Sequence, residues 1–471
     1  MADVTRQLSE FAVNITYDQL PAEVAERVKL LVFDTVGIAL RARHDADSTP
    51  PMLASVKTLG MGIGSARVIG SSETYGPAAA ALINGALAHS LDFDDTHSGG
   101  SIHPSAPIMP AALAAAEMTG ASGKDVIAAI AAGYEVQIRL SMALNPSEHY
   151  ARGFHPSATC GSFGAAAAAG RLFGLSAERM ASAFGIALSQ TSGSLSFLVD
   201  GAWTKRSQVG WAALNGLVAA QMSRDGYVGS GDAIESTKAG FLHAYAPNPA
   251  PELAVKGLGE VWETMLIGVK PYPSCRYTHS SMDALIALRE EHAITEAEID
   301  AVEVGLPKTG WHIIGEEEHE KQNPKTAVDG QFSMPFCAAV VLRQGALGWD
   351  DYARHLTDET TLALTRKVTT VIDPKAEAEF PANMAGVVRV TTKRGTFEGF
   401  AAVPKGEPSN FPTDDEFRSK FDALTEPYLT GERRNQLASA LLSLEKAETI
   451  GGVLELTRPD IDQPLRMAGE D

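Results

Sequence analysis

The segment HSLDFDDTHSGGSIHPSAP, residues 89–107, gathers acidic residues and histidines at the end of an apolar stretch. A histidine can give or take a proton near neutrality because its ordinary pKa is about 6.5. We hypothesise that the carboxylate of Asp92 orients and charges the His103 ring. Two alternatives remain for these residues: a metal site, although the spacing matches no standard calcium loop, or simple helix caps and a solvated loop at Asp94 and Asp95.

A second histidine, His155, stands in the same H-P-S triplet as His103. A residue before proline avoids the helical conformation, so each histidine is predicted to end a loop just before a helix begins. Helix N-termini bind anions, which places both rings where an anionic substrate would lie. Cys160 lies nearby and is an alternative nucleophile, provided that its thiol is activated. The three cysteines form no CxxC pair, so neither a disulfide scaffold nor a structural zinc site is expected.

Basic residues recur in two further motifs, TKRSQVGW and VKPYPSCRYTH. The first contains Lys205 and Arg206, and the second contains Lys270 and Arg276. Such cations can bind anionic groups such as carboxylates. In a chain with an acidic total, two alternatives stay open: either the substrate is a cation, or a few basic residues gather in one pocket. A plain surface residue is the alternative for Lys205.

The composition excludes several other classes of protein. Among 471 residues, 39 Lys and Arg face 58 Asp and Glu, and the formal charge of −19 argues against binding nucleic acid or an anionic membrane. No apolar run reaches the roughly 18 residues of a membrane span. The N-terminal sequence MADVTRQLSEF lacks the apolar run of a signal peptide, so a cytoplasmic location is expected. The sequence contains neither a P-loop nor a GxSxG motif, and its Rossmann signal is weak.

The first half of the chain reads as a series of helices. Apolar residues recur at helical spacing from Pro21 to Arg43, and Ser122 to Asp125 form a capping pattern before another apolar stretch. The abundant Ala and Gly residues predict closely packed helices. Further helices are predicted at 77–91, 106–119, 160–173, 176–189 and 207–224.

The composition changes after about residue 265. A helix is predicted at 280–291, AVEVGLP alternates like a strand, and GVVRVTTKRGTFEGFAAVP predicts a hairpin with a Lys-Arg-Gly turn. The predicted fold is mainly α, with a large all-helical domain and a smaller α+β domain. The predicted boundaries are 1–265 for the first helical part, 266–405 for the α+β domain, 406–457 for the helical return and 458–471 for a mobile tail.

Four long motifs together resemble the MmgE/PrpD family. They are LDFDDT…HPSAP, GFHPSATCGSFGAAAAAGRLFGL, TKRSQVGWAALNG and KPYPSCRYTH, and the likeness runs from about residue 5 to residue 450. This family includes 2-methylcitrate dehydratase, cis-aconitate decarboxylase and iminodisuccinate epimerase. The resemblance implies that the α+β domain is a lid, that the active site lies between the domains, and that the protein is a homodimer without a metal or organic cofactor.

The resemblance also implies which residues line a carboxylate-binding pocket. By motif position, the catalytic candidates are Asp92, His103, His155, Lys205 and Lys270. The substrate-binding candidates are Thr96, Arg206, Arg276, Tyr277 and His279. The implied activity is that of a lyase of the 2-methylcitrate dehydratase type acting on a small di- or tricarboxylate. A cis-aconitate decarboxylase-like enzyme, an iminodisuccinate epimerase-like enzyme and a non-catalytic polycarboxylate-binding protein remain alternatives.

Overall fold

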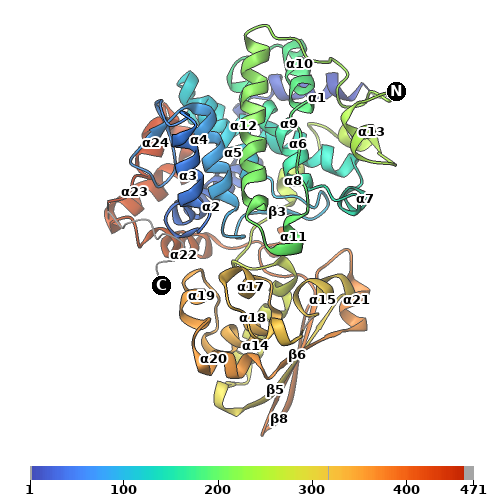
Figure 1. Ribbon diagram of the computed structural model, residues 1–471, viewed down its shortest axis with the longest axis vertical. Helices are drawn as coiled ribbons and strands as arrows, with labels where there is room; N and C mark the ends of the chain where they lie inside the picture. Colours follow the sequence, from blue (N-terminus) through green and yellow to red (C-terminus); the bar gives the residue numbers. More distant parts are fainter. Residues whose placement is uncertain (1–2, 317, 461–471) are drawn as a thin grey trace. The chain divides into compact units, whose positions relative to one another are not determined.

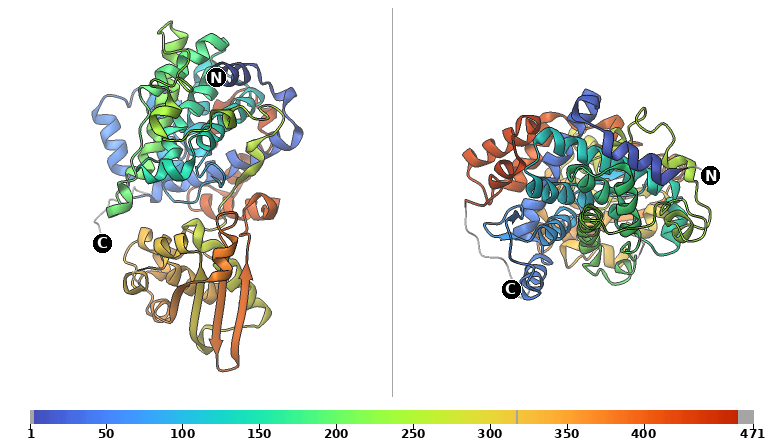
Figure 2. Two further views of the ribbon diagram at one scale, coloured as in Figure 1. Left: turned by 90° about the vertical axis from the view of Figure 1, so that its right-hand side faces the viewer. Right: turned by 90° about the horizontal axis from the view of Figure 1, so that it is seen from above.

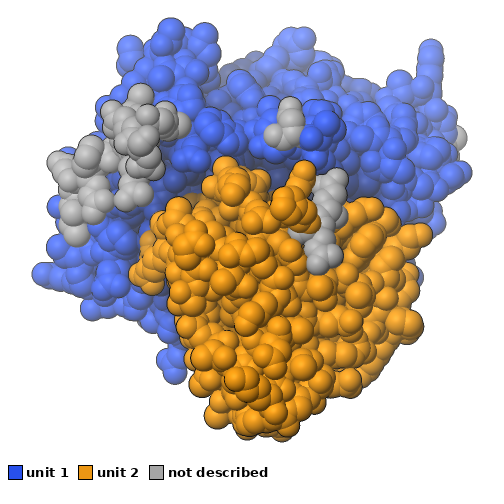
Figure 3. Space-filling model, turned by 60° about the horizontal axis from the view of Figure 1, so that its bottom comes forward, with its two compact units in different colours: residues 1–268, 413–471 blue, residues 269–412 orange. Residues whose placement is uncertain are grey.

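The structure is a computed structural model, and it describes residues 3–316 and 318–460 of the chain. Helices make up most of the elements, which confirms the predicted mainly α class. Contacts divide the chain into unit 1, Met1–Gly268 and Thr413–Asp471, and unit 2, Val269–Pro412, which are coloured separately in Figure 3. Of the predicted mobile tail, residues 461–471 lie outside the described residues.

Unit 1 contains the helices that the spacing of apolar residues predicted in the first half of the chain (Figure 1). The Ser122 cap is present, because its hydroxyl accepts a hydrogen bond from the Asp125 backbone N–H at 3.3 Å. The helices are α1 Val4–Asn14, α2 Ala22–Asp45, α3 Thr49–Thr58, α4 Pro77–His89, α5 Ser105–Thr119, α6 Gly123–Ala143, α7 Pro146–Ala151, α8 Pro156–Thr159, α9 Gly161–Leu172, α10 Ala177–Leu188, α11 Phe197–Asp200, α12 Thr204–Arg224, α13 Phe241–Tyr245, α22 Asp414–Thr425, α23 Gly431–Leu442 and α24 Ile450–Glu455.

Helix α6 is the buried centre of unit 1. Among the described residues it is the one helix long and apolar enough to cross a membrane, and 94% of its most apolar window is buried inside the protein, as in a core helix. Glu135 and Arg139 form an ion pair at 2.9 Å within the helix, and both also bind another segment: Arg139 donates to the carbonyl oxygen of Val261 at 2.6 Å, and Glu135 accepts from the backbone N–H of Thr264 at 2.9 Å. These bonds fix the course of the chain toward residue 268.

The prediction that the large domain is all-helical is wrong in one respect. Unit 1 has two short antiparallel strand pairs, β1 Ala66–Arg67 with β2 Thr74–Tyr75, and β3 Thr96–His97 with β4 Ile267–Gly268. Two-residue strands are too short to produce an alternating pattern, and β3 and β4 are far apart in the sequence. The β3–β4 pair joins the loop that carries the acidic motif to residues 267–268.

Glycine lets α4 and α12 approach each other closely. A Cβ atom on Gly210 would lie 2.3 Å from the carbonyl oxygen of Leu82, and one on Gly85 would lie 2.7 Å from the Cα of Gly210. Neither distance is possible between real atoms, so both positions need glycine. The close approach matters for the site because α12 carries Lys205 in its first turn.

Unit 2 is an α+β structure built on one four-stranded sheet. The strands are β5 Ile299–Leu306, β6 Val368–Ile372, β7 Gly386–Thr392 and β8 Gly395–Ala401, in the order β6-β5-β7-β8 (Figure 2, left). Only the β5–β6 pair is parallel among the pairs in this sheet, and the predicted hairpin is β7–β8. The helices are α14 His279–Glu291, α15 Lys308–Ile314, α16 Glu318–Lys321, α17 Ala327–Gln331, α18 Met334–Gln344, α19 Asp350–His355, α20 Glu359–Thr365 and α21 Pro374–Glu379.

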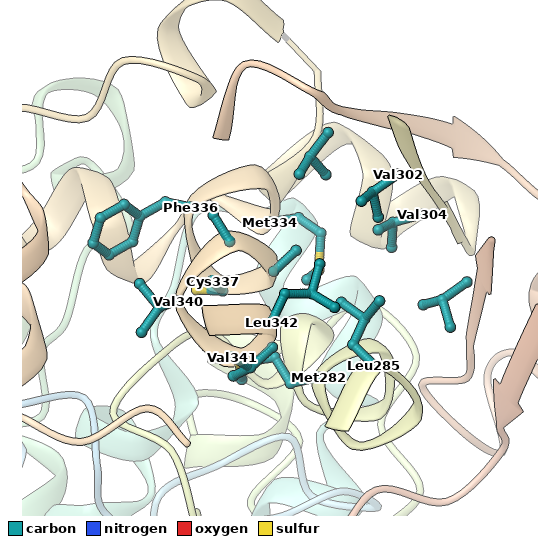
Figure 4. Close-up of a cluster of buried hydrophobic side chains, with 14 of the residues drawn as sticks. Met282, Leu285, Val302, Val304, Met334, Phe336, Cys337, Val340, Val341 and Leu342 are labelled. Carbon is teal, nitrogen blue, oxygen red and sulfur yellow. The ribbon is translucent and has the colours of Figure 1, made fainter. Parts of the chain in front are cut away.

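The core of unit 2 lies between the sheet and helices α14 and α18. Figure 4 shows Leu285 of α14, Val341 of α18 and Val304 of β5 in this apolar cluster, and all three side chains are fully buried. The sequence analysis identified neither α18 nor β6. The signals for α18 were nevertheless present, because Ser333 caps it and Gly345 ends it in a left-handed conformation.

We predict that Gly210→Ala destabilises unit 1. The added methyl group forces α4 and α12 apart, and such overpacking typically costs about 1–3 kcal/mol. Thermal unfolding should therefore begin at a lower temperature than in the wild type. Gly231→Ala is the control, because a Cβ there meets nothing within 4 Å. Equal melting temperatures for the two variants would contradict the packing argument.

Candidate active site

The ends of four helices in unit 1 bring the predicted histidines, acids and lysine together. His89 is the last residue of α4, and Asp92 to Asp95 follow in the next loop. His103 precedes α5, His155 precedes α8, and Lys205 lies in the first turn of α12. In Figure 1 the labels of β3, α8 and α11 gather at the lower end of α12. The N-termini of α5 and α12 carry partial positive charge, which favours an anion nearby.

Asp92 forms an ion pair with Lys205. The Lys205 Nζ lies 2.7 Å from the Asp92 Oδ1, and the two side chains are 22% and 10% exposed. Burial opposes the charge on Lys205, but Asp92 outweighs it and raises the pKa of the lysine above its ordinary value. Asp92 has a left-handed backbone with φ of +51°, an unusual conformation outside glycine that local side-chain contacts must hold. The pair places a charged ammonium at the site.

Asp94 lies between two histidines. Its Oδ2 is 2.7 Å from the Nδ1 of His89 and 3.2 Å from the Nδ1 of His103, and the side chains of Asp94 and His89 are completely buried. Burial alone would raise the pKa of Asp94, but His89 and His103 reverse the effect and hold that pKa well below its ordinary value. Asp94 is therefore an ionised carboxylate in a dry interior.

The ring of His89 meets the ring of His103 edge-on and is stacked with that of His155. The ring of His89 is 4.5 Å from that of His103 and 5.9 Å from that of His155, measured between centroids. The Nδ1 of His155 bonds the amide oxygen of Gln208 at 2.9 Å. Burial lowers the pKa of His89 to about 4 and that of His155 well below its ordinary value, and nearby positive groups add to both shifts. Both rings are therefore neutral near pH 7.

The buried carboxylate of Asp95 supports the fold of the site. Its two oxygens accept bonds from the backbone N–H and the hydroxyl of Ser105 at the start of α5, and that hydroxyl also bonds Tyr134. Burial raises the pKa of Asp95 to about 8, and the negative charge of Asp94 contributes to the shift. The solvated-loop alternative for Asp94 and Asp95 is therefore wrong, because both side chains are buried and bonded.

Three side chains of the cluster offer possible ligands for a metal. His89, Asp94 and His103 each have a ligand atom within 4.8 Å of the others. The 2.7 Å between the His89 Nδ1 and the Asp94 Oδ2 is, however, a hydrogen-bond distance. The alternative of a thiol nucleophile is not supported, because burial raises the pKa of Cys160 to about 12 and keeps the thiol protonated.

The cationic candidates in the second motif belong to unit 2. Arg276 pairs with Glu407 at 2.6 Å and donates to the carbonyl oxygen of Val269, so its charge is already balanced within the unit. The ring nitrogens of His279 lie 3.3 Å from Arg276 and from the carbonyl oxygen of Ser274. Four candidates lie in unit 2: Lys270, Arg276, Tyr277 and His279. That they share one site with the cluster in unit 1 stays a prediction.

The remaining candidates lie in unit 1. Thr96 is in strand β3, opposite Gly268. Arg206 donates to the hydroxyl of Ser48 at 3.2 Å, and burial lowers its pKa. Their roles in substrate binding stay predictions.

The structure changes the hypothesis about His103. The carboxylate that it places against His103 is Asp94, whereas Asp92 binds Lys205. The left-handed turn at Asp92 explains the difference, because it separates the two carboxylates toward different partners. The sequence analysis also missed His89 and Gln208. Their signals were positional: His89 ends the helix before the acidic motif, and Gln208 lies one turn after Lys205.

Comparison with known proteins identifies the family of the chain. The family model for the MmgE/PrpD N-terminal domain matches residues 6–254, and that for the C-terminal domain matches residues 272–445. The chain belongs to the MmgE/PrpD family, which is a family of enzymes.

Similar proteins include several named for one activity. The chain is 30% identical to a cis-aconitate decarboxylase-like protein, oryM, of Aspergillus oryzae, over 96% of this chain and 97% of the relative. It is 28% identical to a cis-aconitate decarboxylase of Aspergillus terreus, over 98% and 97% of the two chains. A cis-aconitate decarboxylase of Mus musculus is 26% identical over 81% and 78%.

We predict that Asp95 makes the protein less stable as the pH rises. Its pKa is about 8 in the fold against an ordinary 3.8, so the folded state holds an extra proton between these values. That contribution is complete below the ordinary pKa and is lost as the pH rises toward 8. Asp95→Asn should therefore reduce the fall in melting temperature between about pH 4 and pH 8.

Asp373→Asn is the matched control, because the pKa of Asp373 in unit 2 is lowered rather than raised. Its variant should keep the wild-type fall over the same pH range. A fall that is unchanged in Asp95→Asn would contradict the assignment.

Proposed function

We propose that this protein is a lyase that acts on a small di- or tricarboxylate by acid–base chemistry beside a carboxylate. The observation that carries the proposal is the contact of His103 with the ionised, buried Asp94, in a cluster that also holds the Lys205 ammonium. A proton donor and a fixed cation are what this chemistry requires, because the carbon acid is weak and its conjugate base is highly charged.

Lys205 is suited to bind the carboxylate. Its charge is maintained by Asp92, and a substrate carboxylate would approach an ammonium that is already desolvated. Charge-assisted hydrogen bonds of this kind contribute on the order of 1.5–3 kcal/mol each. The same ammonium would stabilise the negative charge that develops in the transition state.

Decarboxylation of cis-aconitate is the reaction we place first, because relatives that align over nearly the whole chain are named for it. In this reaction the bond between carbon and one carboxylate breaks and carbon dioxide leaves. The electron pair stays on the carbon skeleton, delocalised toward a remaining carboxylate. His103 then delivers a proton to carbon, which yields an unsaturated dicarboxylate, and the ring regains its proton from solvent.

The choice between reactions is tested with a panel of substrates. Purified protein is incubated with cis-aconitate, 2-methylcitrate, citrate or iminodisuccinate, and the products are identified by NMR. Release of carbon dioxide from cis-aconitate supports the first choice, whereas loss of water from 2-methylcitrate or citrate supports the dehydratase that the motifs suggest. Epimerised iminodisuccinate would identify an epimerase. Binding in a thermal-shift assay without any product would identify a polycarboxylate-binding protein and contradict the proposed function.

We predict that His103→Asn lowers kcat on the substrate that the panel identifies by a factor of about 10²–10⁴, the usual contribution of a general acid or base. The melting temperature should change little, because His103 is partly exposed and Asn keeps a polar group there. His44→Asn is the control: this histidine is stacked on Tyr428, outside the cluster. A His103→Asn enzyme with wild-type kcat would refute the role of His103.

A further inference from the structure

The contacts of Asp94 are those of a residue that orients neighbouring histidine rings. Its Oδ2 contacts the Nδ1 of both His89 and His103, from α4 on one side and from the residue before α5 on the other. An ionised carboxylate only accepts hydrogen bonds. A neutral imidazole beside it must therefore carry its proton on the nitrogen that faces the carboxylate, and the other ring nitrogen keeps a free lone pair.

His89 is held more firmly than His103. The His89 contact is a well-formed hydrogen bond of 2.7 Å within a completely buried pair. The His103 contact is longer, at 3.2 Å, and the His103 Nδ1 has no aligned hydrogen bond among the described residues. Catalytic hydrogen bonds are often long in the absence of substrate and tighten in its complex. His89 thus fixes Asp94 while His103 retains freedom to exchange a proton.

Several other charged or titratable groups surround Asp94. Asp34 of α2 and Lys420 of α22 form an ion pair at 2.7 Å, and Lys420 also donates to the carbonyl oxygen of Phe93. The other charged or titratable groups around Asp94 are Asp95 in the same loop, Lys205 of α12 and the His155 ring before α8. Among the described residues, the Nε2 of His89 and the Oδ1 of Asp94 are buried and have no hydrogen-bond partner.

We propose that Asp94 is a carboxylate that orients two histidines at once. Its hydrogen bond with His89 fixes its position. Asp94 in turn holds the Nδ1 proton of His103, so that the Nε2 of His103 exchanges the catalytic proton. This inference rests on the proposed function for the part that concerns catalysis. His89 and Asp94 act through His103 and need not touch the substrate.

The tautomers are tested directly by NMR of the full-length protein with ¹⁵N-labelled histidine, which needs no substrate. The wild type should show His89 protonated at Nδ1 and unprotonated at Nε2. The NMR signal of the Nδ1 proton should lie strongly downfield. Asp94→Asn should remove the downfield signal, and the neighbouring variant Asp95→Asn should retain it, because Asp95 bonds Ser105 instead. A His89 ring protonated at Nε2, or a downfield proton that survives Asp94→Asn, would overturn the inference.

The catalytic part is tested by kinetics on the same variants and on His89→Asn. Asp94→Asn and His89→Asn should each lower kcat far more than they change KM, by a factor on the order of 10²–10⁴ for Asp94→Asn, as for removal of a carboxylate that orients a catalytic histidine. Adding Asp94→Asn to His103→Asn should cause no further loss, because the two residues act as one unit. If the losses of kcat in the two single variants multiply in the double variant, the residues act independently and the shared role is overturned. His44→Gln serves as the control, because this histidine lies outside the cluster and partial burial lowers its pKa to about 4 as well.

Two further outcomes distinguish a failure of the proposed function, and the binding of a metal ion, from the positioning role of Asp94. If the wild type converts none of the polycarboxylates, the proposed function fails, and the NMR result still decides whether Asp94 fixes His89. Metal analysis of the purified protein is expected to find no stoichiometric transition metal. One equivalent of zinc that is lost in Asp94→Asn would show that the three side chains bind an ion, and it would overturn the positioning role.

Discussion

The structure of the site depends on one ionised carboxylate, Asp94, buried where water cannot solvate it. An isolated charge in such a place costs several kcal/mol, so the surroundings must supply hydrogen bonds and opposite charge. His89 provides a hydrogen bond of 2.7 Å, and the Nδ1 of His103 lies 3.2 Å from the same oxygen. Because these residues come from the end of α4 and the loop before α5, both helices must meet at one point. The close approach of α4 and α12 then brings Lys205 to the same place.

The charged groups of this region alternate in sign. Asp92 is paired with Lys205, Asp34 is paired with Lys420, and Asp94 lies near both pairs. The net charge of −19 therefore says little about the ligand. What matters is that a cation with a maintained charge stands beside neutral imidazoles within an acidic protein. The overall negative charge disfavours large polyanions, while the local cation can still attract a small one.

The sequence predicted the helical elements well because their signals are local. Apolar spacing and capping residues identified α2 and α6, and the turn between β7 and β8 identified the hairpin. The β3–β4 pair was missed because it joins residues that are distant in the chain. Helix α18 was missed although its cap and its terminal glycine were present.

The residues that form the site were predicted better than the contacts between them. Motif position placed His103, His155, Lys205 and Asp92 together, and unit 1 does bring them together. Which carboxylate serves which partner could not be read from D-F-D-D, since the left-handed turn at Asp92 decides it. Asp94 and Asp95 are both buried, and the partners that separate their roles, two histidines for Asp94 and Ser105 for Asp95, depend equally on tertiary packing. His89 was overlooked because a histidine at the end of an apolar helix carries no motif of its own.

The central claim is that this chain delivers a proton to carbon beside a carboxylate. The most direct measurement is to incubate the protein with cis-aconitate in deuterium oxide and follow substrate and product by NMR. We expect loss of carbon dioxide and one deuterium on the carbon skeleton of the product for each turnover, with the rate at which deuterated product forms strongly reduced in His103→Asn. Product without deuterium at carbon, or an equal rate in that variant, would contradict it.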